Sequence, residues 1–470
     1  MTHTLDGPSD LHIPARGCDP QSRAQRSGCS KLSPPGVPSG GCAFDGAKVV
    51  LQPIADTAHL VHGPLACEGN GWDTRTSASS GAQLYRSGFT TDLTEVHITM
   101  GQGEQRLLAS LQQIIEKHAP EAVFVYTTCV TALIGDDVAA VCKDASERFG
   151  VPCIEVPAPG FLGTRNLGNR IAGELLFDRV IGTREPDVVT DTDINILGEF
   201  NLRGELWQVL PLFEELGIRV HACITGDARF QQVASCHRAR VNMVVCSAAL
   251  INLAVRMQER YDIPYFEGSF YGLANTSAAL RQVARLLVAR GADPQLIERT
   301  EVLITREETR AQLRIAPHRQ RLTGKRVLLH TGGYKTWSLI GAFHEIGLHV
   351  RGTMLRKATP EDKRRARAVL PPDACTYETP PERGLRARLD ELPVDLLVSG
   401  GRWQFIAHGA GTAFLDINQG RHHAYAGYEG LVTLAEQADF AINSPVWAST
   451  RAPAPWDAAV SDADLALSAE

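Results

Sequence analysis

Residues 122–158 read AVFVYTTCVTALIGDDVAAVCKDASERFGVPCIEVPA, and this stretch decides the fold class. It begins with a short apolar run, 122–128, and ends with another, 152–158, both typical of buried parallel strands. Between them, residues 135–150 have the apolar spacing of an amphipathic helix, with two aspartates near its start. A strand, a helix and a second strand in this order predict a parallel α/β unit.

The same alternation recurs along the rest of the chain. Further strands are expected at 219–225, 241–247, 326–333 and 394–401, with helices at 204–217 and 336–347. We therefore expect three Rossmann-like domains with mostly parallel sheets, between two terminal segments. The predicted ranges are 1–40 for a flexible N-terminal segment, 41–190, 191–320 and 321–445 for the domains, and 446–470 for a C-terminal segment. The charged, proline-rich range 359–393 predicts a surface excursion.

The bulk composition narrows the class of protein. Of the 470 residues, 44% are hydrophobic and 21% are charged, as in ordinary globular proteins. The net charge of -6 argues against binding to nucleic acid, because a protein that binds nucleic acid normally has a basic face. Since no apolar run approaches the roughly 20 residues of a membrane span, and the polar start lacks a signal sequence, we expect a cytoplasmic protein with no membrane contact.

The chain has eleven cysteines, an odd number. Because the cytosol is reducing, these cysteines are not expected to form a framework of disulfides. Cys42, Cys67 and Cys129 lie in Gly- or Thr-rich turns, and Cys129 follows a predicted strand, where functional loops gather. Glycine turns let backbone N–H groups approach the sulfurs of an iron–sulfur cluster. Without a CxxC element, spacing alone leaves cluster ligands and ordinary buried cysteines as equal alternatives.

Two further groups of cysteines are less decisive. Cys246 closes the predicted strand 241–247, where a core cysteine is as good an explanation as a ligand. Cys18 and Cys29 lie in the flexible lead-in and are interpreted as incidental. If the first three cysteines hold a four-iron cluster, one iron still needs a ligand, and a partner chain is a natural source.

Several long strings make the chain resemble the nitrogenase component 1 superfamily, from about residue 40 to residue 456. Among its members, the chain most resembles those that assemble the iron–molybdenum cofactor. The strings include GCAFDGA (41–47), YTTCVTALIGDDV (126–138), MVVCSAAL (243–250) and HTGGYKTWS (330–338).

The resemblance implies a set of clusters and partners. Cys42, Cys67 and Cys129 would bind a 4Fe–4S cluster shared with a NifN-like β subunit in an α2β2 heterotetramer. Cys246 would bind the precursor of the iron–molybdenum cofactor, an iron–sulfur–carbide cluster. Arg75 takes a position that flanks the cofactor in the family. A cation there would strengthen retention of an anionic cluster or of homocitrate.

Lys335 takes a second such cationic position, and Arg165 and Lys48 are weaker candidates. Two departures distinguish a scaffold from a nitrogenase enzyme. Ala426 takes the place of the second protein ligand, a histidine, and Asn169 takes the place of a histidine that donates protons.

The loop histidines His422 and His423 lie near the missing ligand and are interpreted as solvated.

A scaffold with a loosely anchored precursor is therefore expected, mainly without a catalytic site of its own. Molybdenum and homocitrate would be installed with the nitrogenase iron protein. A NifB-type donor would supply the precursor, and apo-nitrogenase would receive the product. The alternatives are a reductase α subunit, of nitrogenase or of light-independent protochlorophyllide reductase, and a vanadium-system scaffold.

Overall fold

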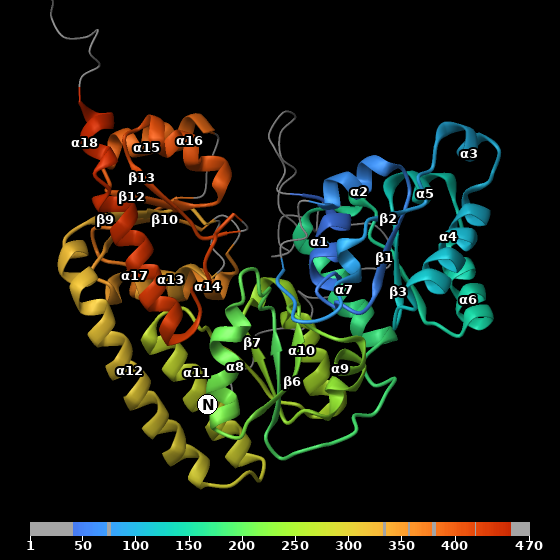
Figure 1. Cartoon of the computed structure of the whole chain (residues 1–470), viewed down its shortest axis with the longest axis horizontal. Coiled ribbons are helices and arrows are strands. Elements are labelled where there is room, and N and C mark those ends of the chain that lie inside the picture. The colour runs from blue at the N-terminus through green and yellow to red at the C-terminus, as the bar shows by residue number, and fades with distance from the viewer. Residues whose placement is uncertain are drawn as a thin grey trace, which may run out of the picture.

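The computed structural model describes residues 41–72, 77–331, 335–355, 358–377, 382–418 and 420–452. In them the chain forms three sheets flanked by helices, and each described strand pair is parallel, which confirms the predicted α/β class (Figure 1). The second sheet lies between the other two in this view. Among the described residues, no helix is long and apolar enough to cross a membrane.

The first sheet has the strand order β2-β1-β3-β4. Its strands are β1 (Ala58–His62), β2 (Phe89–Thr90), β3 (Val123–Thr127) and β4 (Cys153–Val156). Its helices are α1 (Ala43–Leu51), α2 (Leu65–Trp72), α3 (Glu95–Thr99), α4 (Gly103–His118), α5 (Cys129–Ile134), α6 (Val138–Phe149) and α7 (Arg165–Arg179). The predicted helix 135–150 corresponds to α6: Asp137 caps its N-terminus by accepting from the Ala140 N–H, and Gly150 ends it in the left-handed conformation.

The second sheet has the order β6-β5-β7-β8. Its strands are β5 (Asp193–Leu197), β6 (Arg219–Ile224), β7 (Val241–Val244) and β8 (Tyr265–Glu267). Its helices are α8 (Glu205–Glu215), α9 (Phe230–Ser235), α10 (Ser247–Tyr261), α11 (Leu273–Ala289) and α12 (Gln295–Leu322). The central strand β5 lies just after the predicted boundary between the first two domains, at 190/191, and was not predicted.

The third sheet has the order β11-β10-β9-β12-β13. Its strands are β9 (Arg326–Leu329), β10 (His349–Met354), β11 (Cys375–Tyr377), β12 (Leu396–Ser399) and β13 (Ala413–Asp416). Its helices are α13 (Thr336–Glu345), α14 (Pro360–Val369), α15 (Glu382–Glu391), α16 (Gln404–Gly409), α17 (Gly427–Asn443) and α18 (Val446–Arg451). The prediction of a surface excursion at 359–393 is wrong, because this range contains α14, α15 and the edge strand β11. Leu385 and Leu389 bury α15 against the sheet.

In each sheet the strand order reverses between two central strands, and ligands of open parallel sheets bind outside the carboxyl ends of such strands. These strands are β1 and β3 in the first sheet, β5 and β7 in the second, and β9 and β12 in the third. Each reversal therefore marks one expected binding edge.

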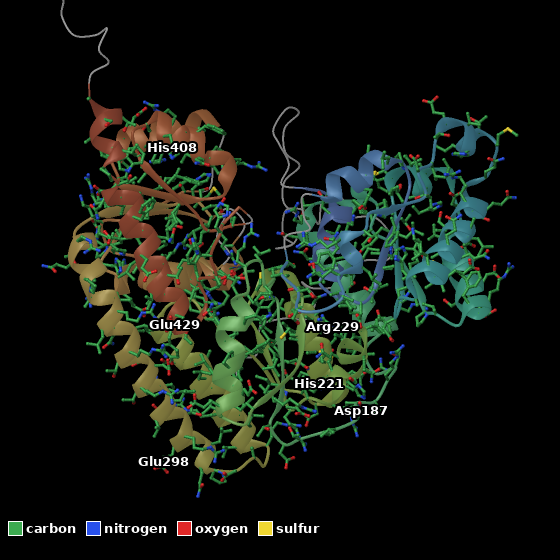
Figure 2. All side chains as sticks on the ribbon, in the orientation of Figure 1. Asp187, His221, Arg229, Glu298, His408 and Glu429 are labelled. Carbon is green, nitrogen blue, oxygen red and sulfur yellow. The ribbon has the colours of Figure 1, made fainter. Side chains whose placement is uncertain are left out.

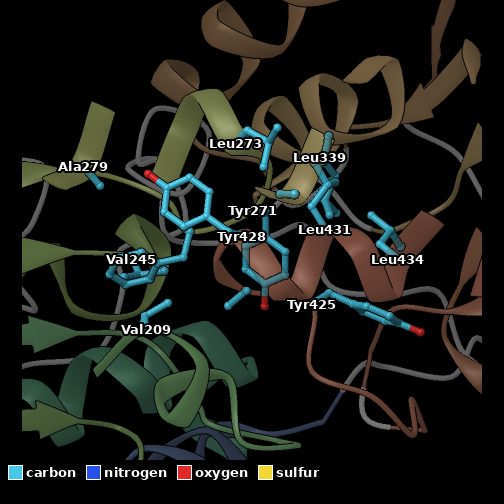
Figure 3. Packing of buried hydrophobic residues seen from close by; sticks show 14 of the residues in the cluster. Val209, Val245, Tyr271, Leu273, Ala279, Leu339, Tyr425, Tyr428, Leu431 and Leu434 are labelled. Carbon is cyan, nitrogen blue, oxygen red and sulfur yellow. The ribbon is translucent and has the colours of Figure 1, made fainter. Parts of the chain in front are cut away.

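Two hydrophobic cores join the three sheets. One runs from the second sheet into the third and contains Tyr271, Tyr428 and the leucines of α17 (Figure 3). At its surface, Glu429 of α17 pairs with Arg314 of α12 (Figure 2). The other core joins the first sheet to the second through α1, α7 and α10. The sheets are thus held in fixed relation by apolar packing, so residues at their edges can form a common site.

Candidate functional site

The three cysteines of the first domain come together at the reversal between β1 and β3. Cys67 lies in α2 after β1, Cys129 begins α5 after β3, and Cys42 directly precedes α1. A Cβ built on Gly160 would stand 3.1 Å from the sulfurs of both Cys42 and Cys129. The Cys67 thiol is close enough to both others to be affected by their charge. The structure thus brings the predicted trio together, and Gly160 leaves room beside the sulfurs of Cys42 and Cys129.

Hydrogen bonds to the backbone hold together the segments that lead into Cys67 and Cys129. The carbonyl oxygen of His62, at the end of β1, accepts hydrogen bonds from the hydroxyls of Thr128 (2.9 Å) and Thr131 (3.2 Å). A Cβ at Gly63 would come within 2.3 Å of the Thr128 hydroxyl, so glycine is required for this approach. These contacts fix the start of the Cys67 turn against the start of α5, which carries Cys129.

The chemistry of the trio favours metal ligation. Burial raises the pKa of Cys42, and it also raises the pKa of Cys67, to which the neighbouring thiols add. Several thiolates this close together repel one another unless positive charge lies between them. Iron would supply that charge, so the thiols and the cradle at Gly160 fit an iron–sulfur cluster.

This arrangement differs from a site for one ion. Among the described residues, no group of three or more His, Cys, Asp or Glu side chains is placed to hold a single metal ion. The ligands of one ion converge on a point, whereas a cluster takes one thiolate at each of several irons. The three thiols have the donor chemistry of cluster ligands.

Two ion pairs lie behind the trio. Lys48 of α1 is fully buried and pairs with Glu68 of α2, the residue after Cys67. Arg165 of α7 lies 3.8 Å from Asp45, whose carboxylate accepts from the Cys42 N–H. Lys48 and Arg165 therefore neutralise carboxylates beside the trio. This placement does not support them as cations for the Cys246 site.

Cys246 lies at the second reversal point, between β5 and β7. It is the N-cap of α10 and is 8% exposed. Gly198, which follows β5, is packed against it: a Cβ there would stand 2.8 Å from the Cys246 nitrogen, and its φ of +86° is in the left-handed region. Burial raises the pKa of Cys246 to about 11, although Lys335 opposes that rise. As the chain stands, Cys246 is a neutral thiol next to a cation.

Lys335 comes from the third domain and reaches the Cys246 site. Its ammonium lies 2.8 Å from a carboxylate oxygen of Glu199 and 4.9 Å from the centre of the Tyr271 ring. Burial disfavours its charge, but Glu199 outweighs this and the pKa of Lys335 is raised. The structure shows a buried pair beside Cys246, and sequence reasoning missed Glu199.

Arg75, the other predicted cation, lies outside the described residues. The chain that follows it is attached to the second domain. Asp227 accepts hydrogen bonds from the Ser79 hydroxyl (2.9 Å) and the Ser80 N–H (3.1 Å). Arg229, the N-cap residue of α9 that Figure 2 labels, also donates to Asp227. Cys18 and Cys29 likewise lie outside the described residues.

The positions that separate a scaffold from an enzyme are well defined. Ala426 is fully buried at the N-cap of α17 and offers no ligand atom. His422 and His423 are exposed, as expected of solvated loop histidines. Asn169 of α7 is buried, and its side-chain oxygen has no hydrogen-bond partner among the described residues. An amide there cannot exchange protons as an imidazole can.

The missed residues share one property: their partners are distant in sequence. Glu199 follows a strand that was not predicted, and Lys335 is 136 residues away from it. Gly160 belongs to a glycine-rich turn, residues 160–163, and its proximity to two cysteines is not visible in the sequence. A glycine directly after a strand is the one local signal that could have drawn attention to Gly198 and Glu199.

Known proteins resemble this chain over most of its length. The family described as Nitrogenase component 1 type Oxidoreductase matches residues 42–443. The chain is 57% identical to a Nitrogenase iron-molybdenum cofactor biosynthesis protein NifE from Mesorhizobium japonicum, over 94% of this chain and 89% of that protein. A protein of the same name from Klebsiella pneumoniae is 49% identical, over 92% of this chain and 95% of that protein.

A solved structure shows the same architecture. "Nitrogenase Cp1 at pH 5" superposes with a TM-score of 0.82 at 27% sequence identity, covering 91% of this chain and 93% of that chain. The chain therefore belongs to the nitrogenase component 1 type oxidoreductase family, and within it to the NifE proteins.

Proposed function

We propose that this chain is a scaffold on which a precursor of the iron–molybdenum cofactor is bound and matured before its transfer to apo-nitrogenase. The observation that carries the proposal is the separation of two thiol sites at adjacent sheet reversals. Cys42 and Cys129 face Gly160 at the first, with Cys67 close to both, and Cys246 lies beside Lys335 at the second. The names of the relatives at 49–57% identity support cofactor biosynthesis as the purpose of these sites.

The first site is proposed to hold a 4Fe–4S cluster shared with a NifN-like β subunit. All three cysteines are partly exposed, so a fourth ligand from outside can reach the same cluster. Exposed apolar side chains lie in the helices that contain Cys67 and Cys129 and in the turn that follows Gly160, and we name them the cysteine rim. The rim consists of Leu65, Leu133, Ile134, Phe161 and Leu162. Clustered exposed apolar side chains mark interaction surfaces, which supports an α2β2 heterotetramer.

When bound, that cluster supplies one-electron transfer. Cys42, Cys67 and Cys129 would hold three of its irons. The His62 carbonyl keeps the neighbouring segments together, and Gly160 leaves the space beside Cys42 and Cys129 open. The nitrogenase iron protein is the proposed source of electrons and of any ATP-driven step, because this chain has no P-loop sequence.

At the second site, Cys246 is proposed to bind the iron–sulfur–carbide precursor as cargo. A NifB-type donor would supply this precursor, and molybdenum and homocitrate would be added to it here. Ala426 offers no second ligand, so a single thiolate anchors the cargo. Asn169 in place of a proton-donating histidine disfavours dinitrogen reduction. Weak anchorage and missing acid chemistry favour carriage over catalysis, whether the heterometal is molybdenum or vanadium.

The test is anaerobic purification of the complex with its β partner, followed by iron quantification and electron paramagnetic resonance. Cys246→Ala should remove the precursor and spare the shared cluster, and Cys67→Ala should do the reverse. A complex without any cluster signal contradicts the proposal. A Cys246→Ala variant with the wild-type iron content and spectrum contradicts the role of Cys246. Dinitrogen reduction by the wild-type complex would favour a catalytic α subunit instead.

A further inference from the structure

The pair formed by Lys335 and Glu199 is one of the most buried ion pairs in the described part of the chain. The Glu199 side chain is 1% exposed and that of Lys335 is 16% exposed. Glu199 is also held by the Phe200 N–H, which donates to its other carboxylate oxygen over 3.1 Å. Removing two charges from water costs several kcal/mol for each ion, and their attraction only partly offsets this cost. A pair of this kind is weak evidence for stability, so its position needs another explanation.

That position is directly beside the cargo thiol. Glu199 follows Gly198, which packs on Cys246 with no room for a side chain between them. Both members of the pair affect the ionisation of Cys246: Lys335 lowers its pKa and Glu199 raises it. A cargo attached to Cys246 would therefore come within the field of both charges, which act on it with opposite sign.

A purely structural role is the alternative explanation. The pair joins the edge of the second sheet to the start of α13 in the third domain, so it could act as a clamp between domains. A second buried pair already provides this link, however. Arg421 donates to Glu205 from two guanidinium nitrogens and also bonds to the Ile417 carbonyl. The clamp explanation leaves unexplained why another pair should be placed beside Cys246.

We propose that Glu199 is an exchangeable counter-ion of Lys335, which the anionic cargo displaces on binding and which recaptures Lys335 when the cargo leaves. Sulfide and thiolate ligands make iron–sulfur clusters anionic, so cargo and carboxylate compete for one ammonium. Glu199 thereby weakens retention and promotes release. No electron is transferred in this exchange. The inference rests on the proposed function at Cys246 and adds to it a residue that sets how tightly the cargo is held.

The sign of one substitution tests the inference. Glu199→Gln keeps the size of the side chain and its acceptor for the Phe200 N–H, but removes the competing charge. We expect the complex with its β partner to lose its cargo to an iron chelator about tenfold more slowly than wild type, as befits one charged hydrogen bond. The cargo is measured as the precursor iron and resonance signal that Cys246→Ala lacks.

A double-mutant cycle separates competition from structure. Lys335→Met should speed cargo loss, and adding Glu199→Gln to Lys335→Met should have no further effect, because the ammonium for which Glu199 competes is gone. Asp193→Asn is the matched control: Asp193 is a buried carboxylate at the opposite end of β5, paired with Arg219. It should lower the melting temperature without slowing cargo loss.

Several outcomes overturn the inference. Cargo loss from Glu199→Gln at the wild-type rate or faster contradicts competition and leaves only the clamp. If Glu199→Gln slows cargo loss equally in the wild-type and in the Lys335→Met background, competition for Lys335 is likewise contradicted. If Glu199→Gln does not fold, Glu199→Asp, which withdraws the carboxylate by one methylene, should slow the loss by a smaller factor, and unchanged loss again contradicts the inference. Failure of the proposed function is distinguishable, because wild type would then carry no iron that depends on Cys246.

Discussion

The sulfur atoms of Cys42 and Cys129 face Gly160 together, each 3.1 Å from the point where a Cβ atom would stand. Gly160→Ala would place a methyl group in the space that the shared cluster needs. Changes next to the ligands of metal sites typically cost 10–100-fold in metal affinity, and we expect a loss of about that size. The measurement is cluster iron in the Cys246→Ala background, in which the precursor does not contribute.

Gly69→Ala is the control for this substitution. Gly69 lies in α2 with Cys67, and a Cβ there would meet nothing within 4 Å. Replacing a helical glycine by alanine stabilises a helix by roughly 0.5–1 kcal/mol, so this variant should keep its iron. An equal loss of iron from both variants would show that the space at Gly160 has no special part in cluster binding.

The cysteine rim predicts how the β partner binds. Leu133 is 77% exposed and lies one helical turn after Cys129 in α5. If the partner covers it, Leu133→Asp should weaken the heterotetramer roughly 10–100-fold, since burying a leucine contributes about 1.5–3 kcal/mol. Leu313→Asp, at a 73% exposed leucine of α12, should leave the association unchanged. Sedimentation of the mixed subunits measures both, and equal behaviour of the two variants would remove the rim from the interface.

The central strands β3 and β7 were predicted from the sequence, whereas the central strands β1 and β5 were missed. β3 is recognisable because all of its side chains are apolar or β-branched. β1 and β5 are harder to recognise, because polar residues stand at their ends and His59 or Asn195 inside them, whereas Asn242 of β7 lies in a longer apolar run, 241–246. His59 and Asn195 are each buried with a partner on the next central strand: His59 with the Tyr126 hydroxyl at 2.8 Å, and Asn195 with Asn242 at 2.8 Å. Such pairs become visible only when the sheet is assembled.

The site follows the same rule. Spacing could not decide whether Cys42, Cys67 and Cys129 form one group, because Cys42 comes near the others through the packing of α1 against α7, β3 and α2. The resemblance of the motifs supplied the grouping, and the structure supplies its geometry. The counter-ion Glu199 could not be predicted, since neither its strand nor its partner is marked in the local sequence.

The buried pair of Lys48 and Glu68 predicts that replacing Lys48 alone destabilises the fold strongly. Replacing both residues should restore most of the stability. Both side chains are nearly inaccessible, and they join the helix that follows Cys42 to the helix that contains Cys67. Lys48→Met leaves the carboxylate without this cation and should lower the free energy of unfolding by about 3–5 kcal/mol. Lys48→Met with Glu68→Leu should recover most of that loss, because an apolar pair needs no compensation. Urea unfolding of the three chains measures it, and a double variant as unstable as the single one would contradict this account.

The raised pKa of Cys246 predicts a loss of stability in alkali. Burial, the largest cause, raises the pKa from 9.0 to about 11 in the folded chain. Below pH 9 the thiol is protonated in both states and its contribution is complete. Between these values the unfolded chain ionises first, so the contribution falls as the pH rises and is lost above about pH 11.

Over this window the metal-free chain should lose about 2–3 kcal/mol more than Cys246→Ala does, the equivalent of two pKa units. The comparison uses the slope of unfolding free energy against pH, so that the packing lost in the variant cancels. Cargo bound at Cys246 fixes the sulfur as a thiolate and should abolish the difference. Equal slopes for the metal-free chains would mean that Cys246 ionises as freely in the folded chain as in the unfolded one, and that its site is open to water.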